Sequence, residues 1–321
     1  MRFAALVSCA AIVLGAAASA AAQTYPHKPL RFVVPFPPGG GADNLARIVG
    51  QKVGADLGQP LVVDNRAGAG GNIAAEVAAQ AAPDGYTLLQ ANVAHTIAVS
   101  LYPSLNYNLL KDFEAVTQLA SVPFVLLASP ALGASTIGEL IELARKRPAG
   151  LDYASSGVGG PSHMAMELFR SMSGLDMRHI PYKGASPAAT DIMAGRVQLM
   201  FFTVSAALPH VTSGKLRALG IASRERFAQL PNVPTVSEAG LPGFEATTWF
   251  GVMVPSGTPA SVIKRLHAVF AGAVRTPEIR ERLAAQGFDV VGSTPQAFAA
   301  FVKSEIPKWA KVVKASGAKA R

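Results

Sequence analysis

The segment VVPFPPGGGAD, residues 33–43, joins an apolar strand to a helix, and the rest of the chain is organised around it. We predict the strand over 30–36 and the helix over 42–57, where apolar residues recur at helical spacing. Glycines permit a turn with positive φ and let main-chain amides approach a guest. The first helical turn adds unpaired N–H groups and a partial positive charge. The segment therefore predicts an anion-binding loop that needs no positively charged side chain.

A second segment of the same kind, YASSGVGGPSH, lies at residues 153–163. A strand again ends in a glycine-rich turn, and a helix is predicted from Pro161, because proline suits a first helical turn. Each helix dipole contributes only about 0.3–1 kcal/mol, whereas a micromolar ligand needs about 8 kcal/mol. Charge-assisted hydrogen bonds must supply the rest. The expected donors are the amides of Gly39, Gly40, Gly157 and Gly160 and the hydroxyls of Ser155, Ser156 and Ser162.

Each of these features also has a purely structural interpretation. The first loop could be a plain turn, and Asp43 could cap free N–H groups at the start of its helix. An acid beside an anion site would repel the ligand, so a direct contact from Asp43 would require a bridging water or a ligand ammonium. His163 could bond to the backbone at its helix start or donate to a ligand carboxylate. The sequence leaves these alternatives open.

Composition indicates a compact protein that attracts acidic ligands and does not bind nucleic acid. The 321 residues are 50% hydrophobic and 15% charged, which suits two globular domains. The formal charge of +9 has no dense Lys/Arg block before the C-terminal tail. Neither glycine loop completes a nucleotide fingerprint, no His pair has metal-ligand spacing, and no G-x-S-x-G occurs. We predict no cofactor, no metal and no catalysis; an exported hydrolase acting on a small carboxylic acid is the rival interpretation.

The first 22 residues have the pattern of a secretory signal peptide. Arg2 precedes an apolar run, and the segment ends in an Ala-x-Ala site with cleavage after Ala22. A membrane anchor, the alternative, would need about 20 apolar residues and different flanks. Cleavage would remove Cys9, so the mature chain would have no disulfide and no Cys-ligated metal. We therefore expect a periplasmic protein.

Short apolar strands alternate with helical segments, which predicts an α/β fold with a mostly parallel sheet. An apolar run at 117–129 and a strand at 247–254 would each carry the chain between two domains. We predict domain 1 from 23–123 and 247–321 and domain 2 from 124–246, with a hinge and a ligand cleft between them. The expected core includes side chains of the helices 161–172 and 296–316: Met164, Met166, Phe169, Met172, Phe298, Phe301, Val302, Ile306, Trp309 and Val312.

Several short motifs occur in order along the chain after residue 22. They are PFPPGG at 35–40 with Asp43 and AR at 46–47, NRAGAGG at 65–71, DGYTL at 84–88, YASSG at 153–157 with His163, PYKG at 181–184, SGKLRAL at 213–219, LPNVPT at 230–235 and EAG at 238–240. Together they resemble the periplasmic receptors of tripartite tricarboxylate transporters, the Bug receptor family. The match covers nearly all of the mature chain, so it is more specific than either glycine loop alone.

The resemblance implies a Venus-flytrap fold of the type II periplasmic-binding-protein kind, with two α/β domains joined by two crossover strands. It implies carboxylate contacts from Phe36, Gly39, Gly40, Asp43, Ser155, Gly157 and His163, with Asn92 also lining the cleft. Thr203 stands where the family often has an acid, and this departure favours a plain carboxylic acid over an amino acid. The implied function is capture of a small organic carboxylate for the subunits of a tripartite tricarboxylate-type membrane transporter, or for a sensor kinase. We expect a monomer.

Overall fold

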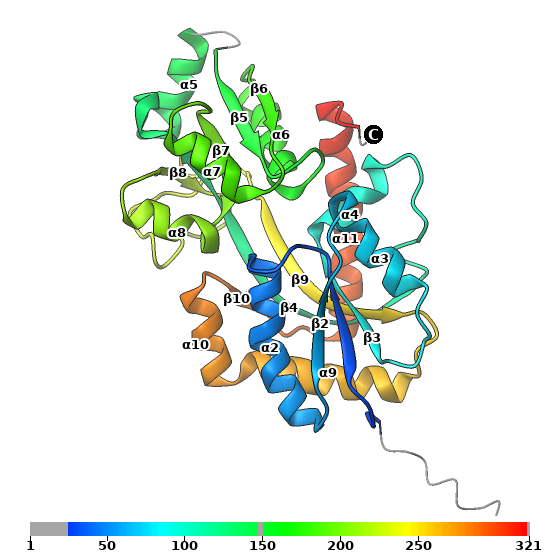
Figure 1. Cartoon of the computed structure of the whole chain (residues 1–321). Coiled ribbons are helices and arrows are strands. Elements are labelled where there is room, and N and C mark those ends of the chain that lie inside the picture. Colours follow the sequence, from blue (N-terminus) through cyan, green and yellow to red (C-terminus); the bar gives the residue numbers. More distant parts are fainter. Residues whose placement is uncertain (1–24, 147–149, 320–321) are drawn as a thin grey trace, which may run out of the picture.

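The computed structural model describes residues 25–146 and 150–319 as two α/β lobes joined by shared strands (Figure 1). The expected signal peptide lies outside the described residues. In the described residues, ten strands are hydrogen-bonded together: eight follow one path of neighbours and two more pair with β4 beside it, and the strands separate into sheet A in one lobe and sheet B in the other. No helix in the described ranges is long and apolar enough to cross a membrane.

Sheet A has a parallel half and an antiparallel half. Strand β1 (Leu30–Val34) lies between β2 (Leu61–Asn65) and β3 (Thr87–Asn92), and all three run parallel. Strand β9 (Thr247–Pro255) pairs antiparallel with β3 and with β4 (Phe113–Ala128). The short β10 (Asp289–Val290) adds to β4. The parallel strands all end toward the same side, where the first glycine loop begins.

Sheet B repeats this mixed arrangement. Its parallel strands are β6 (Arg178–Pro181), β5 (Asp152–Ser155) and β7 (Leu199–Thr203). Strand β4 pairs antiparallel with β7 and with β8 (Arg217–Ile221). The expectation of a mostly parallel sheet is therefore wrong. Parallel pairing is confined to strands joined through helices within one lobe, whereas β4 and β9 pair antiparallel with each other and with the strands they flank.

Strand β4 belongs to both sheets. It pairs with β9 from Phe113 to Pro123 and then with β7 and β8 from Phe124 to Ala128. The exchange of partners falls where Pro123 opposes Thr247, the first residue of β9. The domain limits at 123 and 247 remain our proposal, and this exchange of partners is the observation that supports them.

Ten α-helices cover the two sheets (Figure 1). In the described residues they are α2 (Gly41–Leu57), α3 (Asn72–Ala79), α4 (Val93–Leu101), α5 (Ile137–Lys146), α6 (Pro161–Ser173), α7 (Ala185–Met193), α8 (Val204–Thr212), α9 (Ala260–Arg275), α10 (Pro277–Ala285) and α11 (Pro295–Ser316). The sequence interpretation had no helix at α4 or α8 and no strand at β10. The C-terminal end of α11 rises beside α6 of the other lobe, which it contacts.

The core agrees with the expected side chains except in three places. Phe298, Val302 and Trp309 of α11 are buried, but Phe301 and Ile306 are only partly buried. Glu305 takes a place in the buried stripe, because its carboxylate accepts hydrogen bonds from the indoles of Trp249 and Trp309 and from Lys308. Met172 is 38% exposed. A row of apolar residues along one helix therefore does not by itself identify the buried face.

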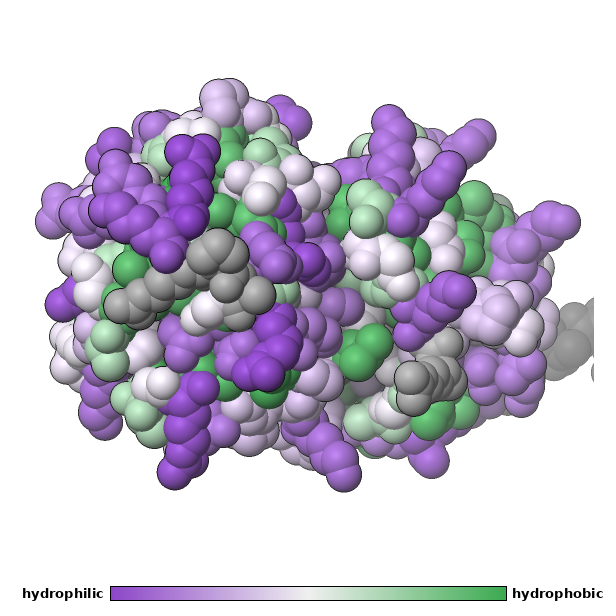
Figure 2. Space-filling view, turned by 90° about the horizontal axis from the view of Figure 1, so that it is seen from above, coloured by the Kyte–Doolittle hydropathy of each residue, from purple (hydrophilic) through white to green (hydrophobic). Residues whose placement is uncertain are grey.

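A contact on the α10 side also joins the lobes. The side-chain amide of Gln229 donates to the carbonyl of Ala284, at 2.7 Å. Gly287 lies so close to the start of α8 that a Cβ there would be 3.3 Å from the amide nitrogen of Ser205. On the face seen from above, polar side chains dominate and hydrophobic patches are small (Figure 2).

Candidate functional site

The first glycine loop turns through Gly39 and is locked by the side chain of Asp43. Gly39 has a φ of 83°, a conformation that favours glycine. Its amide donates to Asp43 Oδ2, at 2.9 Å. Gly40 then caps α2 in an extended conformation, with no side chain capping the helix. The amide of Gly39, expected as a ligand donor, is therefore already paired within the loop.

Asp43 is buried among donors of its own lobe. Its carboxylate also accepts from Arg47 Nε at 2.9 Å and from Asn65 Nδ2 at 3.0 Å. The same Asn65 amide donates to the carbonyl of Phe36, at 2.9 Å, and so fixes the start of the loop. Burial alone would raise the pKa of Asp43, but the hydrogen bonds from Arg47, Gly39 and Asn65 together hold that pKa below its usual value. Asp43 is thus an ionised support of the loop.

The second glycine loop is built in the same way, with a glycine amide that donates to the side chain four residues later. Gly159 has a φ of 72°, and its amide donates to His163 Nδ1, at 2.9 Å. Gly160 caps α6 in an extended conformation, without a side-chain cap. In both loops, the third residue inside the helix accepts the amide of the residue before the helix cap. His163 therefore contacts the backbone, the structural alternative left open by the sequence.

This construction leaves the start of both helices open. The first four amides of an α-helix have no intrahelical acceptor, and no side chain caps α2 or α6. In α2 these amides belong to Gly40, Gly41, Ala42 and Asp43; in α6, Pro161 has no amide, and Gly160 makes only a 3.3 Å bond to the carbonyl of Gly157. Donors thus remain at both helix starts, although not all at the residues we expected.

The serines of the second loop form hydrogen bonds with each other and with the backbone of the loop. Ser155 is fully buried, and its Oγ accepts the amide of Gly157 at 3.2 Å. Ser162 Oγ accepts the amide of Ser156 at 3.0 Å and lies 3.0 Å from Ser156 Oγ. The amide of Gly157 and the hydroxyls of Ser155 and Ser162 are therefore engaged within the loop. These groups, which we expected to be free ligand donors, already have partners within the loop.

Asn92 keeps a donor free beside the first loop. It ends β3 and caps α4, where its Oδ1 accepts the amide of Ala94 at 2.8 Å. The residue is 1% exposed, and its Nδ2 has no partner among the described residues. Gln90, two positions earlier on the same face of β3, donates its Nε2 to the carbonyl of Ala42 in the first turn of α2. The amide of Asn92 therefore lies on the α2 face of sheet A, at the carboxyl end of the strand.

Thr203 lies at a junction that the sequence interpretation did not identify as a helix start. It ends β7 and caps α8, and its Oγ1 accepts from Ser205 Oγ at 3.3 Å. A Cβ on Gly41 would lie 3.7 Å from Ser205 Oγ, so the starts of α2 and α8 meet across the lobes. Across the same boundary, Gly159 packs on Leu101 of α4, where a Cβ would collide with that side chain. The structure thus brings both loops to the boundary between the lobes.

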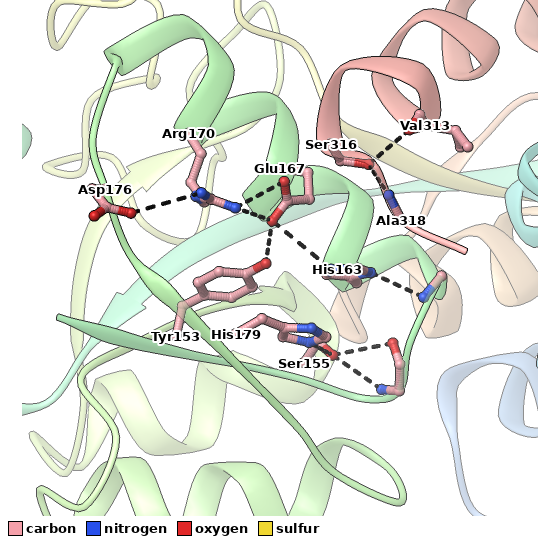
Figure 3. Close-up of polar contacts among 12 residues, drawn as sticks. Tyr153, Ser155, His163, Glu167, Arg170, Asp176, His179, Val313, Ser316 and Ala318 are labelled. Atoms are coloured by element: carbon pink, nitrogen blue, oxygen red, sulfur yellow. Dashed lines mark hydrogen bonds and ion pairs between the residues drawn. The ribbon is translucent and has the colours of Figure 1, made fainter. Parts of the chain in front are cut away.

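The support of the second loop includes residues that the sequence interpretation did not assign. His179 on β6 approaches Ser155, while Tyr153 and Arg170 bond to Glu167 beside His163 (Figure 3). On the first loop, Asn65 and Arg47 were quoted only as parts of a motif. The spacing of Gly39 from Asp43 and of Gly159 from His163, four residues in each loop, is the sequence signal that relates the two.

A separate hollow of about 640 Å³ lies between α2 and β2. Its walls are mostly glycine backbone and apolar side chains, including Gly50, Gly54 and Leu61, with Arg47 at one side. No residue from 36–43 or 155–163 lines it. We assign it no role, because it presents no converging polar groups.

Two α/β lobes joined by crossover strands, with two helix starts open at their boundary, define a solute-binding protein of the Venus-flytrap type. Residues 45–318 match the model of the tripartite tricarboxylate transporter family receptor. The chain is 40% identical to BugT of Bordetella pertussis over 320 residues, 99% of this chain and 98% of that protein. It belongs to the tripartite tricarboxylate transporter receptor family, whose members are periplasmic solute-binding proteins.

Solved structures of similar proteins agree with this assignment. Rpa4515 of R. palustris with adipate superposes with a TM-score of 0.86 at 34% identity, covering 92% of this chain and 99% of that one. MatC of Rhodopseudomonas palustris with bound malate gives 0.82 at 34% identity, over 90% and 100%. The periplasmic binding protein BugD gives 0.84 at 34% identity, over 92% and 100%.

Proposed function

We propose that this receptor closes on a small organic carboxylate without an ammonium group and delivers it to the membrane subunits of its transporter. The observation that carries the proposal is the matched pair of loops, in which Asp43 and His163 each secure a glycine amide and leave an uncapped helix start. Amides at a helix N-terminus, with the helix dipole behind them, suit a carboxylate. Contacts from both lobes would stabilise the closed form.

The proposed ligand class follows from the hydrogen bonds that Asp43 already makes and from the hydroxyl at position 203. Both oxygens of Asp43 already accept hydrogen bonds, so this carboxylate offers little to a ligand ammonium. Thr203 supplies only a hydroxyl at the start of α8. The similar proteins with adipate and with malate hold dicarboxylates. We therefore propose a dicarboxylate, with the Asn92 amide as an additional donor beside the first loop.

We further propose that the chain is exported by cleavage after Ala22, acts as a monomer and performs no catalysis. Mass spectrometry of the exported protein would give its N-terminus, and light scattering would give its mass in solution. A mature chain that does not start at Gln23, or a stable dimer, would contradict the corresponding part of this proposal. Delivery to a transporter, as opposed to a sensor kinase, predicts that deleting the gene abolishes uptake of the ligand.

Thermal denaturation in the presence of a panel of acids tests the ligand class. The panel contains adipate, malate, a tricarboxylate, a monocarboxylate and glutamate, and calorimetry follows on any acid that raises the melting temperature. A ligand at 100 times its Kd adds about 2.7 kcal/mol to the free energy of unfolding, which such an assay detects. We expect a shift with dicarboxylates and a smaller one with glutamate. A larger shift with glutamate would refute the absence of an ammonium site.

Replacement of Gly39 by Val tests the loop itself. Gly39 has open space around its Cα but a φ of 83°, so a side chain would be accommodated only by distorting the turn. We expect Gly39→Val to weaken dicarboxylate binding at least ten-fold in calorimetry. Gly58→Val is the matched control, because Gly58 ends the same helix with a φ of 67° and equally open surroundings. If both variants bind equally well, the loop is not the site.

A further inference from the structure

Two histidines and a tyrosine form a stack beside the second glycine loop (Figure 3). The rings of His163 and His179 lie 3.9 Å apart, at an angle of 11°. Tyr153 stacks on His179 with centroids 4.9 Å apart. Tyr153 and His163 are buried, and His179 is partly buried. Two imidazoles packed face to face repel each other when both are charged, so this geometry favours neutral rings.

The protonation state of His163 follows from its partner. The amide of Gly159 can only donate, so Nδ1 of His163 must be unprotonated to accept it at 2.9 Å. A neutral ring then carries its proton on Nε2, which lies 3.8 Å from Glu167 Oε1. Glu167 is held in place by the hydroxyl of Tyr153 and the guanidinium of Arg170. The carboxylate thus favours the tautomer that leaves Nδ1 free for the loop.

His179 acts on the same loop through Ser155. Its Nε2 lies 2.7 Å from Ser155 Oγ. That hydroxyl oxygen accepts the amide of Gly157 and lies 3.1 Å from the carbonyl of Gly157. One imidazole therefore holds Gly159 directly, and the other holds Gly157 through a serine. Gly157 and Gly159 have φ values of 145° and 72°, so the turn needs such support to keep one shape.

We propose that His163 and His179 are positioning residues, whose neutral rings hold the second glycine loop in its binding shape, and that protonation in acid releases the loop and weakens ligand binding. This inference rests on the proposed function, because it takes the loop as one half of the carboxylate site. It replaces the expectation that His163 donates to the ligand, since both of its ring nitrogens face groups of the protein.

The groups around His163 and His179 set the pH at which the two rings become protonated. Burial, then the neighbouring His179 and Arg170, lower the pKa of His163 to about 3. Burial lowers the pKa of His179 to about 4, with Glu167 opposing and Arg170 adding to the effect. The charged and titratable groups around the pair are Tyr153, Glu167, Arg170 and Asp176, which lies 4.0 Å from Arg170. Protonation of His163, which removes the acceptor for the amide of Gly159, is therefore confined to pH values near 3, and the hydrogen bond holds at neutral pH.

Two substitutions of His163 distinguish the effect of its hydrogen bond to Gly159 from the effect of its stacked ring. Asn places a carbonyl oxygen two bonds from Cβ, as His places Nδ1, and it cannot be protonated. Phe keeps a stacking ring but offers no acceptor to Gly159. With adipate and malate as probes at pH 7, His163→Asn should bind within about three-fold of the wild type. His163→Phe should bind about ten-fold more weakly, a difference of about 1.4 kcal/mol. Equal affinities of the two variants would overturn the proposal.

The pH profile supplies a readout that a structural role would not change. Affinity is measured from pH 7 to pH 3, within the range where urea unfolding shows each variant folded. The titration of the probe's own carboxyl groups is common to all proteins, so the difference between variants reports His163. Wild type should lose affinity toward pH 3 more steeply than His163→Asn. His210→Asn, a change on α8 away from the stack, should follow the wild type. Coinciding profiles of wild type and His163→Asn would contradict the switch.

An NMR measurement judges the positioning role without any ligand. Ring ¹⁵N shifts of His163 at pH 7 should show a bare Nδ1 and a protonated Nε2. The amide of Gly159 should exchange slowly in wild type and at least ten-fold faster in His163→Phe. A proton on Nδ1, or unchanged exchange, would overturn the proposal. If no acid binds while these results hold, the proposed function fails and the account of the loop survives.

Discussion

At the scale of single residues, Asp43 shows how a charge can support an anion site without repelling the anion. Its carboxylate is buried and accepts hydrogen bonds from Gly39, Arg47 and Asn65. These donors neutralise it locally, and Arg47 provides a full positive charge at 2.9 Å. In the site that we propose, the ligand would meet a loop shaped by an acid, with the open amides of α2 as donors. Asp43, which looks misplaced beside a carboxylate site, would then be the residue that fixes the shape of that site.

Replacement of Asp43 tests this role. Asp43→Ala leaves the amide of Gly39 and the side chain of Asn65 without an acceptor, so we expect the free energy of unfolding to fall by about 1–3 kcal/mol at pH 7. Asp43→Asn keeps one acceptor oxygen and should lose less. Urea unfolding of the three proteins measures these differences, with the exposed Arg47→Ala as a control for the loss of the ion pair alone, which should cost less than 1 kcal/mol.

The pH dependence of the Asp43 contribution has a definite sign. The pKa of Asp43 is lowered in the folded state, so its contribution is fully present above the unfolded value of about 3.9 and is lost as the pH falls through the folded value. The difference in stability between wild type and Asp43→Asn should therefore be constant from pH 7 to 5 and shrink below pH 4. A difference that grows in acid would show that Asp43 is not the stabilised anion.

Residue identities in the loops were predictable from the sequence, but hydrogen-bond partners were not. Glycines at 39–41 and 157–160 precede or begin a helix, as the sequence predicted, but the amides of Gly39, Gly157 and Gly159 are paired within the loops. Which amide remains open depends on a side chain one turn later, Asp43 or His163, folding back onto the loop. His179 comes from a neighbouring strand and acts through Ser155, a relation with no fixed spacing along the chain.

At the scale of elements, α4 and α8 were missed for the same physical reason. Each begins at the last residue of a strand, with Asn92 ending β3 and Thr203 ending β7. No glycine or proline separates strand from helix, so a continuous apolar run reads as one strand. Pro209 inside α8 also lowers the helical propensity of that segment. Asn92 with His95 three residues later forms a capping box, and this was the available sign of α4.

The packing of α11 on sheet A gives a prediction at this scale. Gly251 of β9 lies under Phe298, where a Cβ would be 2.2 Å from the ring. Gly251→Ala should therefore displace the ring and lower the free energy of unfolding by about 1–3 kcal/mol. Gly272→Ala is the matched control, because Gly272 is a helical glycine of α9 with open space around it. That change should be neutral or stabilise by up to about 1 kcal/mol.

Urea unfolding at pH 7 distinguishes the two glycines. A loss in Gly251→Ala together with an unchanged or improved Gly272→Ala would support docking of α11 through Phe298. Equal effects of both changes would mean that α11 does not depend on this contact. The outcome bears on function, because the C-terminal end of α11 also reaches α6, whose first turn belongs to the second loop.

At the scale of the whole molecule, the sequence predicted two crossings between lobes, which stay a proposal, but not the direction of the strands at these places. The segment 117–129, with its apolar run at 122–128, was predicted to pass from one domain to the next, and β4 extends over Phe113–Ala128. The direction of a strand relative to its neighbours depends on the lobe in which each end of β4 and β9 lies. That depends on contacts between residues far apart in the sequence. The mixed character of both sheets follows from that exchange and could not be obtained from local patterns.

The contact between Gly287 and α8 provides a test of closure. Gly287 has a φ of 79°, and a Cβ there would be 3.3 Å from the amide nitrogen of Ser205 and 3.4 Å from the ring of Phe227. Gly287→Val would therefore act as a wedge between the lobes at the start of α8. We expect dicarboxylate binding to weaken at least ten-fold and the ligand-induced decrease in the radius of gyration, measured by X-ray scattering, to disappear.

Gly174→Val is the control, because Gly174 has a φ of 68° and no neighbour within 4 Å, so a valine there has the same backbone strain but does not push the lobes apart. A Gly287→Val protein that binds and compacts as Gly174→Val does would show that the lobes do not close at this contact.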